Sequence, residues 1–513
     1  MIDRQAGSSG SQSRAATKKG TRMTAVRRAL LISTADRYFT FASNFAVAAA
    51  VSRILTPSEI GVSVIGMAIL GIALSVREFA SSTFLIQREV LTREDIRASF
   101  SVMFFLTAIV AVALVAITPA LARGYGEERL TSYLHVICIC LFLDLISIQV
   151  TTLLRREMAY ARIMAIDAAG AVTGAVTTIA LALSGFSYMS FAWAWLATSV
   201  VAGLVSIVVR PQFWIFRPSF SNWHGMVRFG GYNGGTALLY KIYDTVPYML
   251  LGWVLSPQAA AVFSRSLMIC QLPNKLILGG AMSVVLPAFS EETRQGRSLR
   301  RPYLRSLEII TALYWPALLV LAVLAEPVVR FVLGSQWHDV VPLVRIVAIA
   351  SLFSFSFEMN YPVMVAMGAI RDSFLRALAT FPASAAILMG AILAGGLQAA
   401  AWSMMFIVPF QAIVAISFVK QRLRMRYADV AQALWKSGIT ALLSATGPVC
   451  VAAATDWRLP LGQSVLACAM AAAGWVVGLV VTRHPLLEEV AHLIPALRHN
   501  WPFRAGMTPA LEK

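Results

Sequence analysis

The chain has 513 residues, of which 58% are hydrophobic and only 13% charged, whereas a soluble globular protein carries about a quarter charged residues. This composition excludes a soluble multidomain enzyme, because no polar stretch is long enough to fold around a core of its own. The net charge of +18 does not indicate nucleic-acid binding, since Lys and Arg accumulate in the cytoplasmic loops of helical membrane proteins.

The predicted elements begin with a basic N-terminus rich in Gly and Ser, residues 1–28, which we expect to be disordered and cytoplasmic. About fourteen apolar stretches follow, each close to the 20 residues that a membrane-spanning helix needs, with twelve spans as the alternative count. The sequence therefore predicts an all-α integral membrane protein. The expected spans begin near Leu30, Glu59, Ala98, Thr131, Arg162, Tyr188, Phe229, Gln258, Ser306, Val340, Phe374, Gln398, Trp435 and Pro460.

Alternate loops are basic. One series, which includes both termini, holds about 32 of the 43 Lys and Arg residues, and the other holds about three. This pattern predicts that both termini are cytoplasmic and that the span count is even. The opposite loops are short, so none of them has room for the catalytic domain of an external polymerase or ligase.

An internal repeat divides the chain. Residues 55–62 read LTPSEIGV, and 200 residues later 255–262 read LSPQAAAV. Each copy follows a span and places Pro where a helix begins. The repeat predicts two pseudo-symmetric six-helix lobes. The expected domains are the N-terminal lobe 29–210, a cytoplasmic linker 211–228, the C-terminal lobe 229–426, two further spans 427–483 and a cytoplasmic tail 484–513.

Several segments resemble the Wzx-type polysaccharide flippases of the multidrug/oligosaccharidyl-lipid/polysaccharide (MOP) exporter superfamily, in particular exopolysaccharide exporters. They are SRILTPSEIG at 52–61, REFASS at 77–82, LLRREMAY at 153–160 and AAVFSR at 260–265. The resemblance implies a MATE/MOP-like fold and a flippase, not an enzyme, in the bacterial inner membrane. It further implies alternating access and translocation of undecaprenyl-diphosphate-linked oligosaccharide to the periplasmic leaflet. Implied partners are membrane lipids and a polysaccharide polymerase or chain-length regulator, with no nucleic acid and no cofactor.

Ionisable residues inside spans mark candidate sites, because each costs several kcal/mol in a bilayer unless it faces a cavity or a partner. Lys241 lies deep in its span and shares a helix face with Asp244. With Tyr240, this pair fits either a self-neutralised contact or a cationic binding site for diphosphate and sugar, and both interpretations remain open. Asp36 and Asp144 are further charged residues within spans.

Arg37 and Arg77 lie at similar depth on consecutive spans. We interpret them as a cationic entrance for the diphosphate, since guanidinium groups bind phosphate in bidentate fashion. Pairing with Glu78 and Asp36 is the alternative. The remaining translocation candidates are Arg265, Asn274 and Lys275, and the coupling-ion candidates are Glu358 and Asp167. Proline at 273 and 362 predicts helix breaks beside Asn274 and Glu358.

No catalytic group and no metal site is expected, since His is scattered and the five Cys residues lie in apolar stretches. Two other exporters of the same superfamily, for drugs or for lipid II, remain alternatives. An enzyme that modifies polyprenyl lipids is a further alternative, and its only candidate acids are the external pair Glu127 and Glu128.

Overall fold

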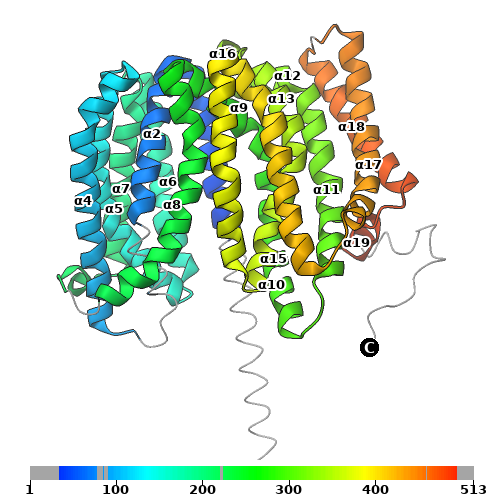
Figure 1. The fold of residues 1–513 in the computed structure, drawn as a ribbon. Helices are drawn as coiled ribbons and strands as arrows, with labels where there is room; N and C mark the ends of the chain where they lie inside the picture. The colour runs from blue at the N-terminus through cyan, green and yellow to red at the C-terminus, as the bar shows by residue number, and fades with distance from the viewer. Residues whose placement is uncertain (1–33, 78–84, 86–90, 220–222, 458, 494–513) are drawn as a thin grey trace, which may run out of the picture. The chain divides into compact units, whose positions relative to one another are not determined.

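The computed structural model describes residues 34–77, 85, 91–219, 223–457 and 459–493, and within these ranges every regular element is a helix (Figure 1). Nine of the described helices are long and apolar enough to cross a membrane, which confirms the predicted multi-pass α-helical class. They are α2 (Pro57–Arg77), α4 (Arg93–Tyr125), α5 (Arg129–Arg156), α6 (Tyr160–Leu183), α7 (Met189–Val209), α11 (Arg300–Val323), α16 (Ile370–Leu423), α17 (Tyr427–Ala454) and α18 (Leu461–Val481).

The other predicted spans coincide with helices that are more polar or are interrupted. Residues 34–54 are helical, and α16 contains a break at Gly395 and Gly396, where two consecutive spans were expected. The count of fourteen spans stays a prediction. The remaining labelled α-helices are α8 (Trp223–Val254), α9 (Pro257–Pro273), α10 (Gly279–Arg294), α12 (Ala325–Val332), α13 (Val340–Ala350), α14 (Phe355–Glu358), α15 (Asn360–Ala366) and α19 (Leu486–Leu493). A π-helical turn, η3 (Asn274–Leu278), and three short 3-10 helices, η2 (Phe213–Phe216), η4 (Ser335–Trp337) and η5 (Ser351–Phe353), complete the described helices.

The helices form two compact units, residues 1–262 and 263–513. Helix α9 begins in the first unit and continues into the second. Helix α8, which the predicted domain scheme assigned to the C-terminal lobe, packs against α2 in the first unit. The division into six, six and two spans stays a prediction.

The two copies of the repeat begin their helices in the same way. Thr56 and Glu59 form a reciprocal cap at the start of α2, with the Thr56 amide 2.8 Å from Glu59 Oε2. At the start of α9 the Ser256 hydroxyl accepts from the Ala259 amide at 3.2 Å. In both copies a hydroxyl caps the helix and proline occupies the first helical position, where its missing N–H costs nothing.

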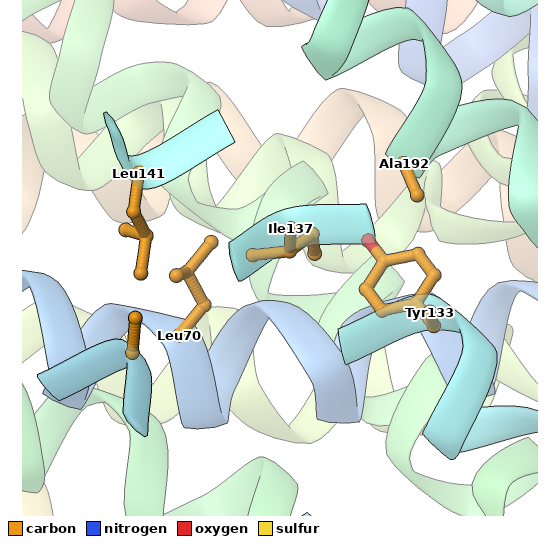
Figure 2. Packing of buried hydrophobic residues seen from close by; sticks show 6 residues of the cluster. Leu70, Tyr133, Ile137, Leu141 and Ala192 are labelled. Atoms are coloured by element: carbon orange, nitrogen blue, oxygen red, sulfur yellow. The ribbon is translucent and has the colours of Figure 1, made fainter. Parts of the chain in front are cut away.

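Small residues let α2 and α8 pack closely in the first unit. A side chain at Gly71 would overlap the Lys241 methylene next to the ammonium group, and one at Gly252 would overlap Ile65. On its other side α2 contributes to a buried apolar cluster with α5 and α7. Figure 2 shows Leu70 reaching from α2 toward Ile137 and Leu141 of α5.

Basic loops gather at one end of the first unit. Arg97 donates to the backbone carbonyls of Arg217 and Pro218, at 3.3 and 3.0 Å. Arg210 pairs with Glu157 at 2.8 Å. The loops that precede α4, follow α5 and follow α7 therefore lie on the same side, as the alternation of charge predicts.

In the second unit α17 and α18 form a hairpin that packs on α11. Gly474 and Gly478 form a G-x-x-x-G spacing, and a side chain at either would overlap the backbone of α17. The indole N–H of Trp475 donates to the Ala312 carbonyl of α11 at 2.8 Å. Close backbone packing and one anchored indole thus fix the hairpin to α11.

Candidate functional site

Arg77 ends α2 beside the predicted entrance, and its partner comes from α5. Its Nη1 lies 3.5 Å from the Leu141 carbonyl, and its charge interacts with the carboxylate of Asp144, one turn further along α5. The indole N–H of Trp195 on α7 donates to Asp144 Oδ2 at 3.2 Å. Three helices therefore meet at a half-buried guanidinium and carboxylate.

A second charged group in the first unit contains two acids and one base. The carboxylates of Asp36 and Asp167 interact with each other and with the guanidinium of Arg155 on α5. Asp36 Oδ1 is buried and has no hydrogen-bond partner among the described residues. Arg37 is exposed on the same helix and lies outside this group. The structure thus brings Asp167 to Asp36, an association that the sequence did not indicate.

Lys241 is half-buried in the middle of α8 and lies against α2. Its Nζ is 3.0 Å from the position of a Cβ at Gly71, and its own carbonyl accepts from Thr245 at 2.8 Å. Tyr240 is half-buried, whereas Asp244 is exposed. Lys241 therefore lies against α2 at Gly71, whereas Arg77 lies six residues further along α2, about 9 Å along the helix axis, on the side that faces α5.

The second unit contains the two helix breaks that proline predicted, and they meet. Asn274 begins the π-helical turn between α9 and α10, and its Nδ2 donates to Glu358 Oε1 at 3.2 Å. Glu358 ends the short helix α14, and Asn360 begins α15. Both predicted breaks are confirmed. The half-buried Glu358 carboxylate thus lies where two helices leave regular geometry, an arrangement typical of functional positions.

Further polar contacts hold this break in place. Asn360 is buried, and its Nδ2 donates to the Ala415 carbonyl at 3.1 Å, while its Oδ1 has no hydrogen-bond partner among the described residues. The Tyr314 and Ser354 hydroxyls lie 2.7 Å apart, close to Glu358. The break therefore has both fixed anchors and a free buried acceptor.

Two further candidates, Arg265 and Lys275, lie on the same stretch of chain as Asn274. Arg265 is only 7% exposed, and its guanidinium carbon is 5.8 Å from the centroid of the Trp337 ring. Lys275 is exposed. Glu78 lies outside the described residues. Sequence reasoning named Asp144 as an in-span charge but did not assign it a role beside Arg77, and it missed Trp195, whose polar N–H in an apolar span was the available signal.

One of the two acids that an enzyme would need, Glu127, already has a partner at the opposite end of the first unit. Both oxygens of Glu127 accept from Arg129, at 2.6 Å each. The hydrogen bond from Arg129 lowers the pKa of Glu127, so this carboxyl is a poor proton donor. The geometry disfavours Glu127 as a general acid.

Known proteins resemble this chain along most of its length. A family model described as polysaccharide biosynthesis protein matches residues 50–342. The succinoglycan biosynthesis transport protein ExoT of Rhizobium meliloti (strain 1021) is 24% identical over 74% of this chain and 77% of its own length. The lipopolysaccharide biosynthesis protein WzxC of Escherichia coli (strain K12) is 19% identical over 86% of this chain and 90% of its own.

Solved structures share the fold. The lipid II flippase MurJ in an inward closed conformation superposes with a TM-score of 0.72 at 12% identity, covering 88% of this chain and 99% of MurJ. A MATE family multidrug resistance transporter of the MOP superfamily gives a TM-score of 0.62 at 17% identity, covering 75% and 94%. These likenesses confirm the expected MATE/MOP-like fold.

Proposed function

This chain belongs to the polysaccharide biosynthesis protein family, and on that premise we propose that it is a flippase for undecaprenyl-diphosphate-linked oligosaccharide repeat units. It moves the repeat unit from the cytoplasmic to the periplasmic leaflet for exopolysaccharide or O-antigen synthesis. The names of its relatives, a succinoglycan transport protein and a lipopolysaccharide biosynthesis protein, support this substrate class.

One observation supports the proposal from the geometry. Arg77, on the side of α2 that faces α5, and Lys241, against Gly71 of α2, are two basic groups about 9 Å apart along this apolar helix. A diphosphate carries negative charge that a bilayer does not solvate, and a guanidinium and an ammonium are the side chains that compensate it. Tyr240 lies next to Lys241 in the chain and offers a hydroxyl for sugar.

The membrane potential favours outward movement of the negatively charged diphosphate. Moving one negative charge outward through an inside-negative potential releases about 2.3 kcal/mol per 100 mV. The helix breaks at Asn274 and Glu358 provide the place where the second unit changes conformation and where a coupling cation binds. Asp167 and Asp36 form the corresponding acidic group of the first unit.

We assign the protein to the bacterial inner membrane with both termini in the cytoplasm. The basic loops that meet at one end of the first unit then face the cytoplasm. The product leaflet is periplasmic, so a polysaccharide polymerase or chain-length regulator is the expected partner there. No step of this account requires a catalytic group or a cofactor.

The test is a clean deletion of the gene, complemented with plasmid-borne variants. The amounts of surface polysaccharide and of undecaprenyl-linked oligosaccharide are measured in the same cells. The deletion should lose polysaccharide and accumulate the lipid-linked unit on the cytoplasmic side. Arg77→Gln and Lys241→Gln should fail to complement, whereas Arg123→Gln, an exposed arginine in the last turn of α4, should complement. If the deletion leaves the amounts of both polysaccharide and lipid-linked oligosaccharide unchanged but increases sensitivity to cationic drugs, the protein is a multidrug exporter. If lipid II accumulates, it is a lipid II exporter.

A further inference from the structure

A polar pocket of about 470 Å³ lies between the first turns of α11 and α17 in the second unit. Arg300, Arg301, Leu304 and Glu308 line it from α11, and Asp429 and Gln432 line it from α17. Residues 301, 304 and 308 follow one face of α11, since positions three and seven apart lie on the same side of a helix. None of these residues belongs to the proposed translocation site.

The acids of this pocket already have basic partners. Asp429 Oδ2 accepts from Arg300 Nη2 at 2.8 Å and from the Arg426 amide at 2.7 Å. The Glu308 carboxylate lies near the positive charges of Lys436 and Arg305 and near the negative charge of Glu488. Arg301, in contrast, makes no ion pair with any residue that the structure describes. Arg301 is therefore the lining cation that remains available to an anionic ligand.

The pocket lies at a membrane surface, because α11 and α17 are both candidate spans and it opens at their first turns. Beyond the pocket, toward its C-terminus, α17 exposes a stripe of large apolar side chains. Trp435, Ile439 and Leu442 are 51%, 37% and 65% exposed, and they follow Gln432 along one face of the helix. A ligand that fits both the pocket and the stripe has a negative headgroup and an apolar tail. Tryptophan is also the side chain typical of the membrane–water interface, where such a headgroup would lie.

We propose that this pocket binds the headgroup of an anionic membrane phospholipid. Arg301 contacts the phosphate, Arg300 supports it from the ion pair with Asp429, and the acyl chains lie along Trp435, Ile439 and Leu442. Basic pockets between helices at the cytoplasmic surface bind anionic headgroups in this manner. The bound lipid bridges α11 and α17. This site is distinct from the translocation path, so its test does not depend on transport.

The full-length chain, purified in detergent and delipidated, is titrated with phosphatidylglycerol or phosphatidylcholine and followed by native mass spectrometry. Wild type should bind phosphatidylglycerol about tenfold more tightly than phosphatidylcholine. Arg301→Gln should lose most of this preference. The matched control is Arg297→Gln, which removes an exposed arginine that pairs with Glu292 in the same basic segment but outside the pocket.

Three results of the lipid titrations would overturn the proposal, and they are equal affinity for the two lipids, a preference that survives in Arg301→Gln, or an equal loss of preference in Arg297→Gln. Arg301→Lys serves if the glutamine variant does not fold, and it should keep part of the preference because lysine keeps the charge but not the bidentate geometry. Inorganic phosphate is the second probe. If millimolar phosphate displaces the lipid, the pocket is a site for soluble phosphate and the lipid assignment is wrong.

Discussion

The carbonyl oxygen of Pro257 lies where a side chain at Gly61 would begin. Gly61 belongs to the first copy of the repeat and Pro257 to the second, so the first turns of α2 approach the backbone of the Leu-x-Pro turn that begins α9. A side chain at Gly61 forces α2 away from the start of α9, and overpacking of this kind costs about 1–3 kcal/mol.

We therefore expect Gly61→Leu to lower the thermal unfolding temperature of the protein in detergent. Gly124→Leu is the matched control, because no atom lies within 4 Å of its Cβ position in α4. An unfolding temperature that is equally unaffected in both variants would show that the close approach of Gly61 to Pro257 does not contribute to stability.

The charge interaction between Arg77 and Asp144 predicts that a single and a double variant differ in stability. Asp144→Asn leaves a half-buried guanidinium without its carboxylate, whereas Arg77→Gln with Asp144→Asn removes both charges. Breaking a buried pair by removing one partner costs up to about 3–5 kcal/mol, and half-burial reduces that figure.

Chemical unfolding in detergent should accordingly show that Asp144→Asn is less stable than the double variant. Transport should be lost in the double variant, because it lacks the guanidinium of Arg77. Normal transport in the double variant would contradict the role of Arg77, and a double variant that is less stable than Asp144→Asn would contradict the pairing.

The contact between Asn274 and Glu358 predicts a defect in transport without a defect in folding. Glu358→Gln keeps a hydrogen-bond acceptor for Asn274 and removes the charge, so expression and unfolding temperature should stay within error. Its transport rate should fall by at least about tenfold if the carboxylate binds a coupling cation.

The readout is the rate of lipid-linked oligosaccharide translocation in vesicles with and without an imposed ion gradient. Glu94→Gln, at an exposed position in the first turn of α4, should behave as wild type. A Glu358→Gln variant whose rate still responds fully to the gradient would exclude this residue as the coupling site.

His484 predicts a pH dependence of stability. Burial, together with the charges of Lys436 and Arg305, lowers the pKa of His484 to about 4. Its Nδ1 accepts from the Leu486 amide at 3.1 Å and its Nε2 lies 3.2 Å from Ser437 Oγ, so the neutral ring fits both contacts. The unfolded chain takes up this proton near pH 6.5 and the folded chain only near pH 4.

The stability that neutral His484 provides is thus complete above pH 6.5 and decreases as the pH falls toward 4, by up to about 1.4 kcal/mol per pH unit. The free energy of unfolding in detergent should fall less between pH 7 and pH 5 for His484→Gln than for wild type. Identical pH profiles would mean that the ring does not remain neutral in the fold.

The features that the sequence predicts well are local. Proline at 273 marks the break that places Asn274 in a π-helical turn, and glycines 395 and 396 mark the turn inside α16. Loop charge predicts that Arg97 and Arg217 lie at one end of the first unit, because orientation depends on composition and not on packing.

The features that it predicts poorly depend on the rotation of one helix against another. Arg77 interacts with Asp144 instead of Asp36, because the side of α2 that carries Arg77 faces α5. Hydropathy sets the length of a span but not its rotation, which close packing at positions such as Gly71 decides. For the same reason the sequence could not bring Asp167 to Asp36.

The most direct test of the central claim is translocation by the purified protein. The full chain is reconstituted into vesicles that contain a fluorescent undecaprenyl-diphosphate oligosaccharide, and an enzyme that cleaves only the outer leaflet reports the accessible fraction. If the protein is a flippase, the enzyme should cleave nearly all of the lipid in wild-type vesicles, because lipid from the inner leaflet reaches the outer one. In vesicles with Lys241→Gln, only the lipid that starts in the outer leaflet should be cleaved. Wild-type vesicles in which cleavage also stops at the outer leaflet, with the protein folded and a membrane potential imposed, would contradict the flippase account.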